Sequence, residues 1–135
     1  MMIILSNSVA QTLGPGQSAT FDTVVLKTGK AECFRLNTGA VRLRFPGAIY
    51  NVYAGANIGA TAAGPAQIAI GFDGSPLLET TMISQTATAG DLNNVSRETG
   101  IETGCCNGGA VTLINTGTSE ITLGANPILY VKRVA

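Results

Sequence analysis

Residues 48–58 read AIYNVYAGANI and alternate between two kinds of side chain. The even positions are apolar from Ala48 to Ile58, whereas the odd positions mix Ile49 and Tyr53 with glycine and asparagine. Because successive side chains of a strand point to opposite faces, the pattern predicts a β-strand with one apolar and one uncharged face. The segment lies within residues 45–72, where two tyrosines are the only ionisable groups. We therefore expect a strand that is covered on both sides.

Similar short segments recur along the chain between glycine-rich turns. Helix-favouring Lys, Glu, Leu and Arg are scarce, while Gly, Thr, Ala, Val and Ile are common, which favours strands. The predicted strands are Met2–Val9, Ala19–Leu26, Ala31–Leu36, Val41–Phe45, Ala48–Ile58, Gln67–Phe72, Pro76–Ile83, Asn94–Glu102, Ala110–Asn115, Glu120–Leu123 and Pro127–Val134. Their number indicates an all-β protein, an antiparallel two-sheet jelly-roll sandwich, formed by residues 1–135 as one domain.

Two turns have a clear mechanism. Gly14-Pro15-Gly16 cannot continue a strand, because proline lacks the backbone N–H that a ladder requires. Asp73-Gly74 stands between two apolar segments, and both residue types tolerate a positive φ. The second pair predicts a tight β-hairpin.

The first and last predicted strands are also apolar on both faces. Met2-Ile3-Ile4-Leu5 and Ile128-Leu129-Tyr130-Val131 contain no charge at either parity. Strands of a single sandwich usually have one face in water, so these faces need a cover. Association with a further copy is one interpretation, and coverage by loops of the same chain is the alternative.

Catalytic chemistry is not indicated. Histidine, the commonest general base and metal ligand, is absent from all 135 residues, and we expect no catalytic residue, no metal site and no cofactor. Glu98 and Glu102 share one strand face, which favours a solvated edge over acid–base work. Cys33, Cys105 and Cys106 are expected to be free thiols, with a bridge from Cys33 to either neighbour as the alternative. We therefore expect that the protein is not an enzyme.

Charge gives little information about partners. Eight basic and eight acidic residues cancel, so nucleic acid is not an expected partner. A membrane is not expected either, because the uncharged residues 45–72 contain too many glycine, proline, asparagine and glutamine residues for a membrane span. Arg42 and Arg44 fall on one face of a predicted strand and are a candidate basic patch for an acidic capsid surface or an anionic glycan. An ordinary solvated strand face is the alternative interpretation.

Three segments, in this order, resemble the TNF/C1q-like jelly-roll domains, in particular the small versions encoded by phages and bacteria. They are Phe45-Pro46-Gly47-Ala48-Ile49-Tyr50-Asn51-Val52, Ile68-Ala69-Ile70-Gly71-Phe72-Asp73-Gly74 and Ile128-Leu129-Tyr130-Val131-Lys132-Arg133. The spacing differs at one point, because Ala48 and Ile49 separate Gly47 from Tyr50 where the family usually has one residue. The resemblance covers most of the chain.

The resemblance implies a homotrimer whose first, last and tyrosine-bearing strands pack around a threefold axis. The implied trimer interface consists of Ile3, Leu5, Tyr50, Val52, Tyr53, Leu129, Tyr130 and Val131. The start of the chain lacks the basic flank of a signal peptide, so we expect synthesis in the bacterial cytoplasm, and the resemblance implies that the final location is a virion. The resemblance thus implies a non-enzymatic structural or adhesion module: a capsid decoration, head fibre or tail appendage whose partners are itself and another virion protein. A lectin-like domain that binds host-surface glycans is the alternative, weakened by the absence of tryptophan.

Overall fold

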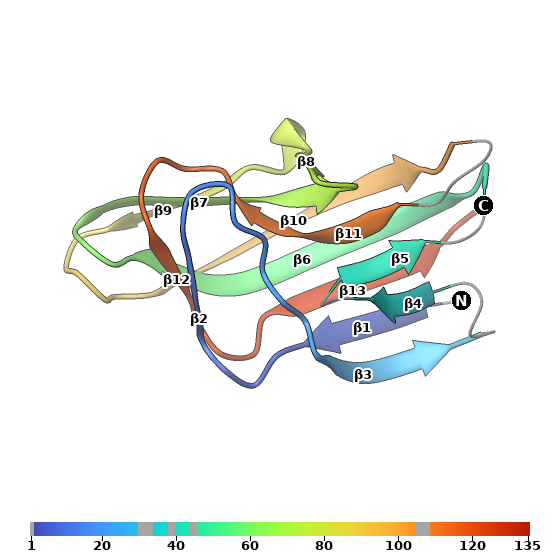
Figure 1. Ribbon diagram of the computed structural model, residues 1–135, viewed down its shortest axis with the longest axis horizontal. Coiled ribbons are helices and arrows are strands. Elements are labelled where there is room, and N and C mark those ends of the chain that lie inside the picture. Colours follow the sequence, from blue (N-terminus) through green and yellow to red (C-terminus); the bar gives the residue numbers. More distant parts are fainter. Residues whose placement is uncertain (1, 30–33, 38–39, 44–45, 105–108) are drawn as a thin grey trace.

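Two antiparallel β-sheets pack against each other and enclose one apolar core (Figure 1). The computed structural model describes residues 2–29, 34–37, 40–43, 46–104 and 109–135. The seven strands of the first sheet are β1 (Met2–Ser6), β2 (Gln11–Leu13), β3 (Thr23–Thr28), β6 (Ile49–Ala60), β10 (Asn93–Glu102), β12 (Ile121–Leu123) and β13 (Ile128–Arg133). The six strands of the second are β4 (Phe34–Asn37), β5 (Ala40–Leu43), β7 (Gly64–Phe72), β8 (Ser75–Pro76), β9 (Met82–Thr86) and β11 (Ala110–Asn115). The expected all-β, two-sheet jelly roll is confirmed.

Strand β6 is the centre of the seven-stranded sheet. One edge of β6 pairs with β10, in register from Ile49 opposite Glu102 to Ile58 opposite Asn93. Its other edge pairs with β13 over residues 50–55 and with β12 over residues 58–60. β13 then pairs with β1, and β1 with β3, while β12 pairs with β2. The first and last strands are therefore neighbours, as Figure 1 shows near the two termini.

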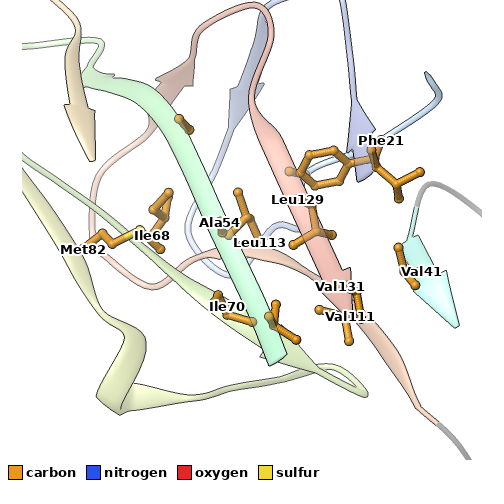
Figure 2. Close-up of a cluster of buried hydrophobic side chains, with 14 of the residues drawn as sticks. Phe21, Val41, Ala54, Ile68, Ile70, Met82, Val111, Leu113, Leu129 and Val131 are labelled. Atoms are coloured by element: carbon orange, nitrogen blue, oxygen red, sulfur yellow. The ribbon is translucent and has the colours of Figure 1, made fainter. Parts of the chain in front are cut away.

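The core lies between the sheets and is formed by alternate residues of β1, β6 and β13 together with side chains of β7 and β11. On β6 these are the even positions, including Tyr50, Val52 and Ala54, each with no exposed surface. Figure 2 shows part of this cluster, in which Leu129 and Val131 of the first sheet meet side chains of the second, such as Leu113. Full burial of an aliphatic side chain contributes about 1.5–3 kcal/mol, so this layer holds the two sheets together.

The hairpin predicted at Asp73-Gly74 is confirmed. Phe72 pairs with Ser75 across the turn, and the two central residues have φ values of 54° and 86°. Positive φ at both positions is the geometry of a type I′ turn, whose twist matches that of the flanking strands.

The strand predicted from Pro76 to Ile83 is wrong, because this segment is split. β8 ends at Pro76 and is followed by a 3₁₀ turn, η1 (Leu78–Thr80), before β9 begins at Met82. The buried hydroxyl of Thr80 donates to the carbonyl of Leu77 at 2.6 Å and accepts from the N–H of Ile70 at 2.8 Å. The Thr80 hydroxyl thus accepts a hydrogen bond from β7 in place of a backbone carbonyl. The chain can therefore stop pairing with β7 after β8 and pair with it again in β9.

The strand predicted from Ala19 to Leu26 also differs from the structure. Ala19 bonds to the second sheet through Leu113, whereas β3 begins only at Thr23 and pairs with β1 in the first sheet. The buried ring of Phe21 lies between these two attachments. The sequence also gave no signal for β2, because a three-residue strand is too short to show a period.

Asn115 joins the end of β11 to strand β2 and to the turn before β12. Its buried amide nitrogen donates to the carbonyls of Leu13 and Ser119 at 3.0 and 2.9 Å, and its amide oxygen accepts from the N–H of Gly117 at 3.0 Å. These bonds join β2, β11 and the turn that leads to β12.

We expect Asn115→Ala to lower the free energy of unfolding by about 2–4 kcal/mol, because it leaves buried backbone groups without partners. Gln85→Ala, at an exposed position of β9 in the second sheet, is the control and should change it by less than about 0.5 kcal/mol. Urea unfolding at one fixed protein concentration measures both values. Equal effects of the two substitutions would contradict the role assigned to Asn115.

Candidate functional site

The side of the seven-stranded sheet that points away from the core is the candidate site, and we call it the outer face. Register defines it, since residues directly opposite each other on paired strands share a face. Its members are Met2, Ile4, Leu26, Thr28, Ile49, Asn51, Tyr53, Gly55, Asn57, Asn94, Ser96, Glu98, Gly100, Glu102, Ile128, Tyr130 and Lys132. Most of them are uncharged.

One row of this face crosses five strands. Leu26 lies opposite Ile4, Ile4 opposite Tyr130, Tyr130 opposite Tyr53, and Tyr53 opposite Glu98. The row is therefore apolar or aromatic at four of its five positions and ends in a carboxylate at the β10 edge. Cross-strand aromatic and aliphatic pairs of this kind form a continuous surface, because their Cβ atoms lie about 5 Å apart.

The apolar residues of the outer face are only partly covered. Ile4, Tyr53 and Tyr130 are half-buried, while Leu26, Ile49 and Ile128 are 44%, 41% and 36% exposed. The segments predicted to be buried on both sides thus have a second face that is open in the isolated chain. An open apolar surface of several adjacent residues is a typical interaction site.

Gly55 makes the middle of the outer face flat. An added Cβ at this buried position would lie 3.3 Å from Cγ2 of Ile128 and 3.4 Å from the hydroxyl of Tyr53. The Tyr53 side chain therefore reaches over the glycine along the sheet instead of standing away from it. A flat aromatic surface can be covered closely by another protein.

The polar part of the outer face lies towards β10. The amide nitrogen of Asn51 donates to Oε1 of Glu98 at 2.8 Å and fixes this exposed carboxylate over the sheet. Lys132 lies opposite Asn51 on the other side of β6 and is exposed. The outer face thus combines an apolar row with a small set of charges.

The structure separates the eight residues implied as a trimer interface into two groups. Tyr53 and Tyr130 lie on the outer face. The other six point into the core of the same chain and are 0–1% exposed: Ile3, Leu5, Tyr50, Val52, Leu129 and Val131. Contact of these six with a second copy does not agree with their burial, so the candidate surface consists of their outward-pointing neighbours. The sequence analysis missed Ile4, Asn51, Glu98 and Lys132 as members of this surface. Alternation along the strand leads from Tyr53 to Asn51 and from Tyr130 to Lys132, whereas Ile4 and Glu98 are placed on the face only by the pairing of strands.

Other sequence-based candidates give less. Arg42 is exposed on β5, whereas Arg44 and the three cysteines lie outside the described residues, so neither the basic patch nor a disulfide is tested. Glu98 and Glu102 are both exposed on β10, which agrees with a solvated edge. Within the described ranges no cluster of three potential metal-ligating side chains occurs. In the part of the chain that the structure describes, no helix is long and apolar enough to span a membrane.

A pocket of about 340 Å³ lies on the opposite side of the molecule, at the second sheet. Ile114 and Gln67 come from the sheet, and Pro76 and Leu78 come from the segment around η1. Its lining residues include no charged side chain, and the Leu78 beside it is 71% exposed. Its size is at the lower end of the range for small-molecule sites.

Comparisons with known proteins give a structural likeness only. No family model and no curated protein sequence matches the chain. Among solved structures, a TNF called Eiger from S. frugiperda has a TM-score of 0.73 at 10% identity, covering 100% of this chain and 92% of that one. Murine APRIL has a TM-score of 0.67 at 13% identity, with 98% of each chain covered. The globular domain of zebrafish complement 1qA has a TM-score of 0.66 at 12% identity, covering 99% of this chain and 97% of that one.

The fold is a TNF/C1q-like jelly roll. The coverage includes nearly the whole of each chain, so both sheets of the TNF/C1q-like fold are present. At 10–13% identity the likeness establishes the architecture, and the activity has to be argued from the surface.

One charged substitution on each face of the first sheet tests which face is internal. Val52→Asp places an unpaired charge in the core, where the loss is about 3–5 kcal/mol or more, and we expect this variant to lose its cooperative unfolding transition. Tyr130→Asp changes a half-buried side chain of the outer face and should keep the β-type circular dichroism spectrum and a cooperative thermal transition. A well-folded Val52→Asp variant would contradict the assignment of faces.

Proposed function

We propose that this protein is a non-enzymatic structural or adhesion module that acts as a homotrimer, and that it serves on a phage particle as a capsid decoration, head fibre or tail appendage. The observation that carries the proposal is the open apolar row of Leu26, Ile4, Tyr130 and Tyr53 on the outer face. A surface of this kind is stabilised when it is buried against another protein surface.

Self-association is the simplest way to cover the row. Each 100 Å² of apolar surface removed from water contributes roughly 2.5 kcal/mol before the entropy of association is subtracted. A copy of the same chain is always present at the concentration of the chain itself, and closed symmetry limits the assembly to a defined size. The interface is therefore expected to be permanent, not transient.

Three copies are proposed because of the sequence resemblance to TNF/C1q-like domains, which implies packing of the first, last and tyrosine-bearing strands around a threefold axis. In the structure these strands, β1, β13 and β6, are adjacent and form the middle of the outer face. A threefold ring places the outer faces of the copies towards the axis and leaves the second sheet facing outwards.

A structural role agrees with the chemistry of the chain. The sequence contains no histidine, and the acidic residues Glu98 and Glu102 are exposed on a strand edge instead of enclosed in a cleft. The assignment to a virion rests on the resemblance to the small phage and bacterial versions of the fold. The partners in this proposal are two further copies of the chain and a protein of the particle.

Glycan binding at a host surface is the second candidate, and the pocket beside Ile114 and Leu78 is the observation that favours it. A site for sugar usually needs an aromatic platform, and Tyr50, Tyr53 and Tyr130 lie on or inside the other sheet. A glycan array separates the candidates. Binding that is lost on Leu78→Asp and retained in Tyr130→Asp would support the lectin-like function.

Light scattering across a wide dilution range tests the homotrimer. We expect a mass near three times 13.8 kDa, unchanged by reductant, and a mass near 13.8 kDa for Tyr130→Asp, because a carboxylate would be buried without a partner in the interface. A wild-type protein that stays monomeric at all concentrations would overturn the proposed assembly.

Mass spectrometry of purified particles tests the location. We expect peptides of this chain to copurify with phage particles produced by cells that carry the sequence, at a constant ratio to the major capsid protein through a density gradient. Recovery only from the particle-free fraction would contradict a virion role.

A further inference from the structure

The charges of the outer face are few and they are of opposite sign. Among the residues assigned to this face only Lys132, Glu98 and Glu102 are charged. They lie on β13 and β10, on the two sides of β6. The rest of the face is uncharged, so these three side chains are the groups most affected when the face is covered.

Glu98 is held in position by its neighbour. The Asn51 amide donates to Oε1 at 2.8 Å, which leaves the other carboxylate oxygen, Oε2, available as an acceptor. Glu98 also lies at the end of the apolar row, directly opposite Tyr53. Its carboxylate is thus oriented at the border of the surface that association would bury.

Lys132 has the complementary property. Within the part of the chain that the structure describes, its ammonium forms neither an ion pair nor a hydrogen bond, and the residue is exposed. It lies opposite Asn51 in the β13–β6 register, one step along β6 from the Tyr130–Tyr53 pair. A positive charge without a partner therefore stands beside the same apolar row.

A ring of three copies joins unlike surfaces. In a cyclic trimer the contact is head to tail, so one side of the outer face of each copy meets the other side in the next copy. A charge buried in such a contact without a partner would cost several kcal/mol, whereas a paired and hydrogen-bonded charge is tolerated. Within the outer face, Lys132 lies on one side of β6 and the oriented carboxylate of Glu98 lies on the other.

We propose that Lys132 of one copy forms an ion pair with Glu98 of the neighbouring copy, repeated around the threefold axis, and that this pair fixes how the copies are rotated against each other. The inference rests on the proposed homotrimer. The apolar row supplies the non-directional part of the affinity, and the pair selects one arrangement because every shifted packing leaves charges unpaired.

Glu102 is not the partner in this proposal. It lies opposite Ile49 at the end of β10, away from the Tyr130–Tyr53 pair, and no side chain in the described ranges orients it. The control of the same charge is Glu79, which is exposed in η1 beside the second sheet and lies outside the outer face. Lys27 of the exposed strand β3 is the corresponding control for Lys132.

The test is a charge-reversal cycle read by the concentration at which the trimer dissociates. We expect Lys132→Glu and Glu98→Lys each to raise this concentration roughly tenfold or more, since each brings like charges together, and the double variant to recover most of the loss. The milder Lys132→Gln and Glu98→Gln variants should change it in the same direction by less. Lys27→Glu and Glu79→Lys should leave it near the wild-type value.

The outcomes separate the pairing from the trimer. If the Lys132→Glu and Glu98→Lys trimers dissociate at the same concentration as the wild type at low salt, the ion pair is overturned and the homotrimer is not. The pairing would also be overturned if both single variants dissociate at a higher concentration than the wild type and the double variant does not return towards the wild-type value. A wild-type chain that is monomeric throughout would remove the homotrimer first, and the pairing with it. Recovery in the double variant, together with smaller single effects at high salt, supports the proposal.

Discussion

The pairing of β6 on both of its edges is the constraint on which the rest of the structure depends. Its twelve residues hold β10 along one edge and share the other edge between β13 and β12. A strand paired along both edges cannot move by one residue without exchanging its two faces, so the register of β6 fixes the register of its three neighbours. The order of the seven-stranded sheet and the composition of both of its faces follow from it.

Small residues allow this central position. At Gly59 an added Cβ would overlap the carbonyl oxygen of Asp91, and at Gly55 it would press on Ile128 and Tyr53. The first close contact lets the loop before β10 cross β6, and the second lets the tyrosine lie along the sheet. Both glycines share the odd parity of β6, so small odd residues bring other segments close on the outer face while the even residues fill the core.

Alternation along the strands was predictable from the sequence, but the arrangement across the strands was not. The pattern in residues 48–58 identified the strand and its two faces. Asp73-Gly74 identified the hairpin because both residue types tolerate a positive φ, which both residues have in the structure. At the first strand Ile3 and Ile4 are equally apolar, so the sequence alone could not decide which of them points inwards. That choice depends on pairing with β13, more than 120 residues away, where Ile3 meets Val131 and Ile4 meets Tyr130. The segment around Thr80 escaped prediction because a side chain there takes over a backbone hydrogen bond, which no periodicity reveals.

The same limit explains why the charged part of the candidate site was missed. Asn51 and Glu98 are separated by 47 positions in the sequence, and only the β6–β10 register brings the amide to the carboxylate. Apolar contact alone does not determine an orientation, because burial of apolar area is nearly independent of direction. On a face as flat as that around Gly55, many rotations would bury similar areas, and the few charges decide between them. Because the chain has few charges, each charged residue on the outer face restricts how two copies can pack. In a shifted packing Lys132 would meet mostly uncharged residues of the neighbouring copy and remain unpaired.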